Sequence, residues 1–233
     1  TLFRSALLVG WVTGSVAFPL LAQETTKNDT VVVTSQMQSG ATKLATPDIE
    51  TPQSVSIVTR EQFEEQGATS VRQAVSYTPG VYSNQIGASN RFDYIVLRGF
   101  SDGSLDNVYL DGLKMMGDTN SHSSLVVDPW FLEDIEVVRG PASVLYGRSS
   151  PGGIVALTSR KPSFDAGGEV KLFAGNNNQR GAAFDVTGAL DDNDRVAARL
   201  SGMTRYADSQ FGPLKEERYA LMPSLTWRIT DQT

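Results

Sequence analysis

The chain has 233 residues, a formal net charge of −6 at pH 7, one histidine and no cysteine. Without cysteine it forms no disulfide, thiolate zinc site or iron–sulfur cluster, and a single histidine excludes a multi-histidine metal site. The lysines and arginines are scattered along an acidic sequence, which argues against nucleic acid as a partner because phosphate neutralisation needs a clustered basic face. We therefore expect no protein-held metal, no cofactor and no nucleic acid.

The first residues predict a secretory signal peptide, with cleavage expected after Ala22. Arg4 precedes an apolar stretch, residues 6–21, that changes abruptly to the polar segment 23–28, which is the layout of such a peptide. A transmembrane anchor is the alternative, but glycine, serine, threonine and proline interrupt a stretch already marginal for the roughly 20 residues that a spanning helix needs. No long apolar run follows, so any membrane location beyond the peptide requires β-strands.

Residues 23–53 predict a mobile arm, because they are polar, lack helical periodicity and contain two Thr-Pro pairs that favour extended backbone. Within the arm, residues 30–34 (Thr-Val-Val-Val-Thr) are β-branched throughout, as in a strand without a local partner. Such a segment suits pairing with the exposed sheet edge of another protein. An ordinary first strand of the following domain is an equally good local interpretation.

From residue 54 to 162 the pattern predicts a compact α+β domain. Thr59 with Gln62, and Ser70 with Gln73, have the spacing of a capping box. The expected elements are strands at 54–59, 91–98, 134–139 and 154–160, a hairpin at 107–112, and short helices at 60–66, after Ser70, from Asp128-Pro129, and between Pro141 and Gly147.

Residues 168–233 predict about four long strands that alternate between apolar and polar side chains. In 218–229 one face carries Tyr219, Leu221, Pro223, Leu225, Trp227 and Ile229, and the other carries Arg218, Ser224, Thr226 and Arg228. Residues 195–206 and 184–190 repeat this pattern, and 169–174 show it more weakly. Outward apolar and inward polar residues are typical of a transmembrane β-barrel wall.

A soluble β-sandwich is the alternative for this region, because its half-buried strands alternate in the same way. Strands of roughly 10 residues suit a tilted membrane crossing, whereas soluble strands average nearer 5 or 6 residues. A tight turn at 191–194 and a longer loop at 207–217 also fit the two ends of a barrel wall. These features favour the wall.

The glycine-punctuated blocks of the chain form an ordered set. They are Asp29-Thr-Val-Val-Val-Thr34, Leu97-Arg-Gly-Phe100, Tyr109-Leu-Asp-Gly112, Val138-Arg-Gly-Pro141, Leu145-Tyr-Gly147 and Ser149-Ser-Pro-Gly-Gly153. In this order and spacing they resemble the energy-coupling box and plug domain of TonB-dependent outer-membrane receptors, particularly the ferric hydroxamate siderophore receptors of the ferrichrome and ferrioxamine type. The resemblance covers nearly the whole chain.

The resemblance implies an α+β plug domain followed by the first antiparallel strands of a 22-stranded transmembrane β-barrel. Four strands cannot enclose a plug of this size, so the barrel is incomplete and we expect the chain to be the N-terminal part of a longer receptor. Its place would be the outer membrane of a Gram-negative bacterium, with the arm in the periplasm. TonB, outer-membrane lipid and a ferric siderophore are the implied partners, with phage or colicin as opportunistic ligands, and the receptor would be a monomer.

Site residues follow from the same resemblance. TonB would pair with Asp29, Thr30, Val31, Val32, Val33 and Thr34. Arg98 and Arg139 would anchor the plug to wall glutamates beyond residue 233, although an arginine in such a place is usually solvated or structural. Plug loops 83–90, 101–106 and 115–124 would contact the cargo through Ile86, Ser104, Leu105, Met116 and His122; otherwise His122 is an exposed polar residue.

The expected cargo is a ferric hydroxamate of the ferrioxamine type. Ferrichrome is disfavoured because segment 84–90 lacks an arginine and the loop around 120–123 lacks the aromatics of ferrichrome receptors. A receptor for a catecholate siderophore or a cobalamin, and a passive porin or structural barrel with a plug-like domain, remain the alternatives. A signalling receptor is disfavoured, since only residues 23–28 separate the cleavage site from the box.

An enzyme is not expected. The glycine-rich segment 147–153 lacks the Gly-Lys-Ser/Thr ending of a phosphate-binding loop. The sequence contains no nucleophile elbow, and no pair of carboxylates suggests acid–base catalysis. We expect these glycines to serve tight turns and close packing.

Overall fold

The structure, a computed structural model, describes residues 37–38, 43, 46–47, 50, 52–84, 87, 93–100, 107–115, 117–118, 123–209 and 215–229. All of the described residues belong to one compact unit within 35–233. The predicted signal peptide, the box at 29–34 and the predicted cargo contacts Ile86, Ser104, Leu105, Met116 and His122 lie outside the described residues. None of the helices in the described part is long and apolar enough to cross a membrane.

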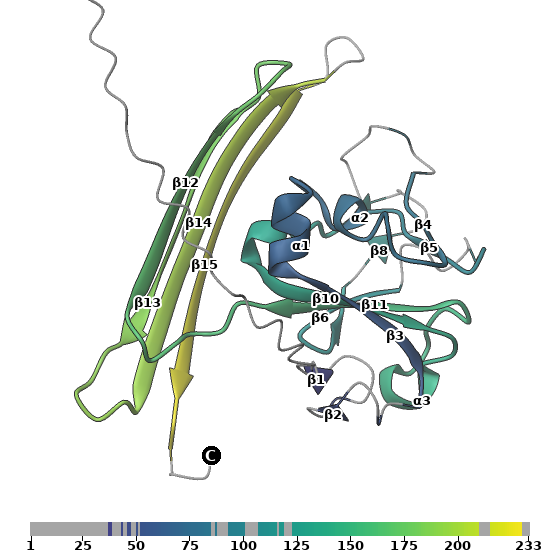
Figure 1. Cartoon of the computed structure of the whole chain (residues 1–233), viewed down its shortest axis with the longest axis horizontal. Helices are drawn as coiled ribbons and strands as arrows, with labels where there is room; N and C mark the ends of the chain where they lie inside the picture. The colour runs from purple at the N-terminus through teal and green to yellow at the C-terminus, as the bar shows by residue number, and fades with distance from the viewer. Residues whose placement is uncertain are drawn as a thin grey trace, which may run out of the picture. The chain divides into compact units, whose positions relative to one another are not determined.

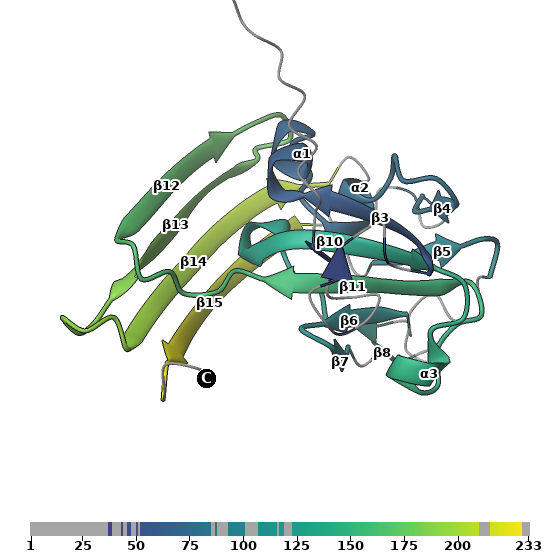
Figure 2. The same cartoon turned by 60° about the horizontal axis from the view of Figure 1, so that its bottom comes forward.

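A central sheet, drawn in Figures 1 and 2, has the strand order β3-β10-β11-β6-β7, and Figure 2 labels all five strands. Its strands are β3 (Ser54–Thr59), β10 (Leu132–Arg139), β11 (Gly153–Ser159), β6 (Val108–Leu110) and β7 (Leu113–Lys114). Neighbours are antiparallel except β11 and β6, which are parallel. The predicted strands at 54–59, 134–139 and 154–160 are confirmed to within two residues, and so is the hairpin, whose turn residues Asp111 and Gly112 both have positive φ.

The two central strands are buried on both faces. Ile135 and Val137 of β10 and Val155 of β11 have no exposed surface, and they pack in one cluster with Phe63 and Val75. These last two come from α1 (Arg60–Glu65) and from the residue that ends α2 (Val71–Ala74). On the other face a smaller cluster joins Tyr109, Val138 and Ile154 to Tyr146 of α3 (Ser143–Tyr146). Coverage of both faces explains the nearly continuous apolar runs of these strands.

Side-chain caps fix where the short helices begin. Thr59 accepts a hydrogen bond from the Gln62 amide while the Gln62 side chain accepts one from the Thr59 amide, so the first capping box is confirmed. Ser70 caps α2, but the second box does not close, because the Gln73 side chain accepts from Thr69 instead. The predicted turn at Asp128 is a 3-10 helix, η2 (Pro129–Phe131), with the expected cap.

The predicted strand 91–98 is wrong for most of its described length. Only β5 (Val96–Leu97) forms there, paired with β4 (Val81–Tyr82). Asn107 Nδ2 donates to Ile95 O at 2.9 Å, so a side chain occupies an acceptor that a ladder would use. Two further small pairs join β1 (Met37–Gln38) to β2 (Thr46–Pro47) and β8 (Gly117–Asp118) to β9 (Ser123–Ser124).

A second sheet, called here the wall sheet, is an antiparallel meander in the order β12-β13-β14-β15 (Figure 2). Its strands are β12 (Gly167–Ala174), β13 (Arg180–Ala189), β14 (Val196–Asp208) and β15 (Lys215–Trp227). The predicted alternation is confirmed. Tyr219, Leu221, Leu225 and Trp227 on one face of β15 are 63–76 % exposed, whereas every second residue between Lys215 and Trp227, on the other face, is half-buried.

The connections of the wall sheet are shorter than predicted at one end. The turn at 191–194 is confirmed, and the Asp191 carboxylate closes it by accepting from the amides of Arg195 and Val196. The predicted loop 207–217 is wrong at both borders, because β14 continues to Asp208 and β15 begins at Lys215. Asp208 and Lys215 are direct cross-strand partners, and opposite charges at such positions favour pairing. Polar composition alone does not reveal this.

Candidate functional site

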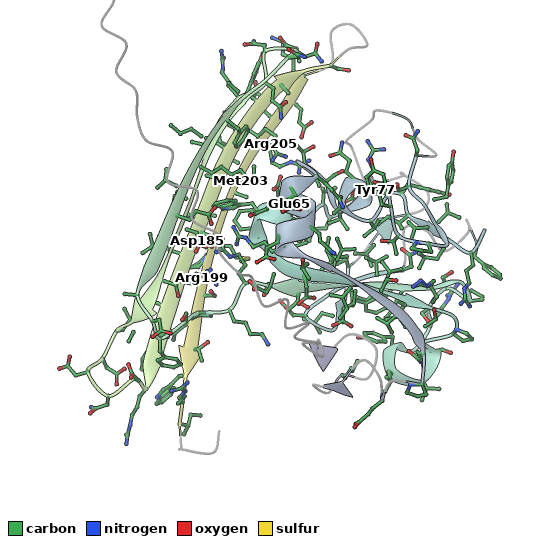
Figure 3. The ribbon with its side chains drawn as sticks, in the orientation of Figure 1. Glu65, Tyr77, Asp185, Arg199, Met203 and Arg205 are labelled. Carbon is green, nitrogen blue, oxygen red and sulfur yellow. The ribbon has the colours of Figure 1, made fainter. Side chains whose placement is uncertain are left out.

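The central domain contacts the wall sheet through an apolar cluster. Trp130 and Phe131 of η2 pack with Ala183 of β13 and Met203 of β14. The Trp130 indole donates a hydrogen bond to Phe184 O at 3.3 Å. Figure 3 shows Met203 on the same face of the wall sheet as Asp185, Arg199 and Arg205. This face therefore holds both the apolar contact and the charged groups that surround it.

Asp128 lies at the centre of the first charged group, called here the Asp128 cluster (Asp128, Arg205 and Arg218). One carboxylate oxygen accepts from the Trp130 amide at 3.0 Å and caps η2. The other accepts from Nη1 of Arg205 at 2.7 Å and from Nη1 of Arg218 at 3.2 Å. Arg205 Nη1 also donates to Thr69 O at 3.0 Å. Asp128 is 4 % exposed, so a buried carboxylate of the central domain binds two arginines of the wall.

Asp185 is the centre of a second charged group. Its carboxylate accepts from Arg199 Nε at 3.0 Å and lies 3.2 Å from Arg160 Nη2, and the Ser201 hydroxyl donates to it. Arg160 follows β11, and Arg199 and Ser201 are on β14. Burial first, and then the charges of neighbouring arginines, lower the pKa of Arg160. Close by, Arg60 Nη2 of α1 pairs with Glu169 of β12 at 2.8 Å.

Three cations surround the ring of Trp130. Arg60 lies 5.3 Å from a ring centroid, Arg160 5.7 Å and Lys171 5.9 Å, which are distances at which a cation is attracted to the face of an indole. Lys171 belongs to β12 and the other two to the central domain. The ring therefore lies near cations of both the central domain and the wall sheet.

A cavity of about 170 Å³ lies beside the Asp128 cluster, lined by residues that include Phe63, Trp130, Phe173, Met203 and Arg205. Small-molecule pockets usually measure roughly 300–1,000 Å³, so the cavity is smaller than a siderophore needs. Within the described ranges, His, Asp and Glu side chains nowhere gather into a group of three that fits a metal ion. We assign neither cargo nor metal to this cavity.

Of the predicted site residues, Arg98 and Arg139 are described, and the structure brings them together. A β-carbon placed on Gly80 would lie 3.5 Å from Cδ of Arg139 and 3.9 Å from Cγ of Arg98. Arg139 donates to Ser56 Oγ and, at 3.4 Å, to Pro79 O. Burial first, and then the charge of Arg98, lower the pKa of Arg139. Neither arginine forms an ion pair with a carboxylate of another described residue, and their anchoring role remains a prediction.

Helix α2 contacts one described residue of the first predicted cargo loop. Arg72 of α2 donates from Nη1 to Gly87 O at 2.6 Å, and its amide donates to Asp93 Oδ1 at 3.3 Å. Burial raises the pKa of Asp93 to about 6 against the lowering effect of Arg72. Gly87 lies within predicted loop 83–90, and Asp93 follows that loop, so α2 fixes one described point in the loop and one just after it.

Sequence reasoning missed the partners in these groups. Local patterns identify Asp128 only as a helix cap, and Arg205 and Arg218 only as members of a polar strand face. The available signal is the presence of arginines on the plug-facing side of the wall strands, since inward charges need counter-ions. The sequence does not identify the counter-ion, because Asp128 precedes Arg205 by 77 positions.

Residues 47–154 match the family model of the TonB-dependent receptor plug domain. This range contains β3, β10, β6, β7 and the first two residues of β11. The chain belongs to the TonB-dependent receptors, with the central domain as its plug and the wall sheet as the beginning of the barrel.

Curated relatives narrow the family. The chain is 92 % identical over 230 residues to the ferrioxamine B receptor of Salmonella typhimurium strain LT2, covering 99 % of the chain and 33 % of that protein. It is 48 % identical to the ferrioxamine receptor of Yersinia enterocolitica, covering 86 % and 28 %, and 40 % identical to the ferrichrome outer membrane transporter/phage receptor of Escherichia coli K12, covering 91 % and 28 %. The chain thus spans about a third of the length of these relatives.

A solved structure agrees with the fold. The open form of the ferric-catecholate import receptor Fiu from Escherichia coli K12 superposes with a TM-score of 0.69 at 28 % identity, covering 82 % of this chain and 27 % of that one. The plug and wall sheets together therefore have the arrangement of elements found in this receptor family.

Proposed function

We propose that the receptor to which this chain belongs captures a ferric hydroxamate siderophore of the ferrioxamine type and admits it to the periplasm by TonB-driven movement of the plug. The observation that carries the proposal is 92 % identity, over 99 % of the chain, to a protein named as a ferrioxamine B receptor. An alignment of 230 of the 233 residues includes nearly all of the three predicted cargo loops. The receptor would lie in the outer membrane of a Gram-negative bacterium, with the plug arm in the periplasm.

The proposed mechanism is binding followed by powered gating. Cargo would bind the plug loops that include Ile86, Leu105 and His122, and TonB would add a strand to residues 30–34. Strand addition obtains its affinity from main-chain hydrogen bonds, so a pull on the arm acts along the backbone. Arg98 and Arg139, which lie together on the plug, would oppose the pull through wall glutamates. No catalytic step is required, and the relatives are receptors and transporters by name.

The exposed apolar face of the wall sheet supports a lipid partner. Leu221, Leu225 and Trp227 are more than 60 % exposed on one face of β15, which is the arrangement of a barrel strand against hydrocarbon. A monomer within the membrane accounts for this face without a protein partner. Phage or colicin would bind the same receptor as opportunistic ligands.

Replacing Val32 with proline in the full-length receptor tests the energy-coupling step. Proline removes a backbone donor from the strand that TonB needs, so we expect uptake of radiolabelled ferrioxamine B to fall to the level of a strain without TonB. Equilibrium binding to whole cells should keep its Kd. The matched control is Thr25→Pro, which lies in the same arm but outside the box. Loss of both binding and uptake, or of neither, would contradict the proposal.

Competition distinguishes the alternative cargoes. Unlabelled ferrioxamine B should displace the labelled chelate, whereas a ferric catecholate or a cobalamin should not. If either of these competes more strongly, the cargo assignment is wrong while the receptor class stands. Uptake that continues after addition of a proton uncoupler would favour a passive porin.

A further inference from the structure

Two arginines of the wall sheet face each other directly. Arg205 of β14 and Arg218 of β15 are cross-strand partners in register. Like charges at such positions destabilise a sheet, because their Cβ atoms are only about 4.5–5.5 Å apart. The side chains are also mostly buried, with 9 % and 17 % of their surface exposed. The wall sheet by itself therefore contains a destabilising pair of charges.

The plug supplies an anion that relieves this repulsion. The carboxylate oxygen of Asp128 that does not cap η2 accepts from both guanidiniums, at 2.7 and 3.2 Å. Arg218 Nη2 pairs in addition with Glu216 at 3.2 Å. Two cations then face two anions, and removal of the plug would leave one positive charge in excess. The charge of the arginine pair is thus fully compensated only while the plug contacts the wall.

The position of Asp128 in the chain distinguishes the Asp128 cluster from the Arg160–Asp185 pair. Arg160 is joined to the wall by the short segment 161–166 before β12, so that pair stays close even if the plug shifts. Asp128 has no such tether, since β10, α3 and β11 lie between it and the wall strands. Its ion pairs break whenever η2 leaves the sheet.

We propose that Asp128, Arg205 and Arg218 form an ionic latch that holds the plug against β14 and β15 and sets the threshold for plug movement. The latch rests on the proposed function only in that movement of the plug is the gating step. It differs in polarity from the predicted anchoring by Arg98 and Arg139, because here the plug provides the anion and the wall provides the cations. Asp128, Arg205 and Arg218 act as positioning residues in this latch.

The test pulls the plug from the wall without cargo and without TonB. Full-length receptor in lipid vesicles is held by its N-terminal arm, and the rate of plug extraction at constant force is measured. Asp128→Asn keeps the oxygen that caps η2 but removes the charge, and we expect extraction on the order of tenfold faster or more. Glu61→Gln, at an exposed position in α1, is the matched control and should not change the rate.

Two further variants separate charge from folding. Arg218→Lys keeps the cation and should stay near the wild-type rate, whereas Arg218→Met should accelerate extraction. In a background of Arg205→Met and Arg218→Met, Asp128→Asn should no longer accelerate extraction, because the cations that its charge binds are absent. Equal rates for wild type and Asp128→Asn, or additive effects, would overturn the latch. If Asp128→Asn fails to fold, the comparison of Arg218→Lys with Arg218→Met tests the latch instead, and equal extraction rates for these two variants would overturn it.

The outcome is independent of the cargo and of energy coupling. Extraction by force needs neither siderophore nor TonB, so a wrong cargo assignment leaves the latch result intact. Conversely, Val32→Pro tests coupling without touching the wall contact. If Asp128→Asn speeds extraction but leaves ferrioxamine uptake normal, the ion pairs hold the plug but do not limit transport. The proposed threshold for plug movement would then be wrong.

Discussion

The plug sheet and the wall sheet use β-strands in opposite ways. In β11 of the plug, five successive residues from Gly153 to Leu157 are buried, whereas exposure in β15 of the wall alternates residue by residue along its whole length. The two central plug strands are covered on both faces, whereas the wall strands leave one apolar face open. The difference shows that burial in the plug depends on neighbours from distant parts of the chain, whereas in the wall it depends on the side-chain period of two.

The largest effect is expected where two backbones of the plug pack closely, because an added methyl group has no room there. Gly153 has φ +133°, and a β-carbon there would lie 2.0 Å from Val138 O. We expect Gly153→Ala to destabilise the plug by about 3 kcal/mol or more, because both strain and overpacking oppose it. The measurement is hydrogen exchange of β10 and β11 amides in the full-length receptor.

Gly67→Ala is the control for this substitution. Gly67 also has positive φ, +64°, but a β-carbon there meets no atom within 4 Å. Its cost should be about 1 kcal/mol. Equal protection losses in the two variants would show that backbone conformation, and not the close approach of β10 and β11, limits the plug.

The open apolar face is the wall property to break next. Leu221 is 65 % exposed in the middle of β15. If this face meets hydrocarbon, Leu221→Arg should cost about 2–4 kcal/mol in a folded barrel. Urea titration of the full-length receptor in lipid vesicles measures this cost, with Leu221→Ala as the control that keeps the face apolar. A soluble sheet would tolerate the exposed arginine, so a negligible effect would contradict the membrane assignment.

Buried carboxyl groups also differ between the plug and the wall, and the effect expected from them is smaller. In the wall, Asp185 has two arginines and a hydroxyl as partners, whereas in the plug the pKa of Asp93 is raised by burial to about 6, from an ordinary 3.8. The folded plug therefore binds this proton more tightly than the unfolded chain does. Protonation of Asp93 stabilises the folded plug fully below about pH 4. This stabilisation is lost as the pH rises to 6, and the free energy of unfolding falls by at most about 3 kcal/mol.

Asp93→Asn should remove that pH dependence. Asparagine still offers an oxygen to the Arg72 amide, so the variant should be more stable than wild type at pH 7 and similar at pH 4. Hydrogen exchange of α2 amides, corrected for the intrinsic rate at each pH, measures the change. Arg72, Arg218 and Asp128 also act on Asp93, and a pH profile that persists in the variant would assign the titration to one of them or to another group.

Periodicity and capping predict much of this fold from sequence. The alternation of β15 and the caps at Thr59 and Asp128 depend on neighbours within a few residues, and a local pattern therefore reveals them. The strand predicted at 91–98 is wrong for most of its described length, where the side chain of Asn107, 12 residues from Ile95, donates to the Ile95 carbonyl. The full lengths of β14 and β15 escape prediction because pairing of Asp208 with Lys215 decides where they end.

The candidate site is predictable only in part. Arg98 and Arg139 stand out from sequence through their Arg-Gly blocks, and the structure places them together. The Asp128 cluster escapes prediction, since its charges come from a helix cap and from two strand positions that carry no motif. Contacts between sheets depend on register and on the packing of η2, which a one-dimensional pattern does not contain.

Trp130 gives this contact a built-in optical reporter. Its indole is 7 % exposed, donates to a wall carbonyl at 3.3 Å and lies 5.9 Å from Lys171 of the wall. Departure of the plug would transfer the ring from this charged, dry surrounding into water and shift its emission to longer wavelength, while Trp227 on the outer face keeps its environment. The difference in emission between wild type and Trp130→Phe therefore allows plug release to be timed in an unlabelled receptor.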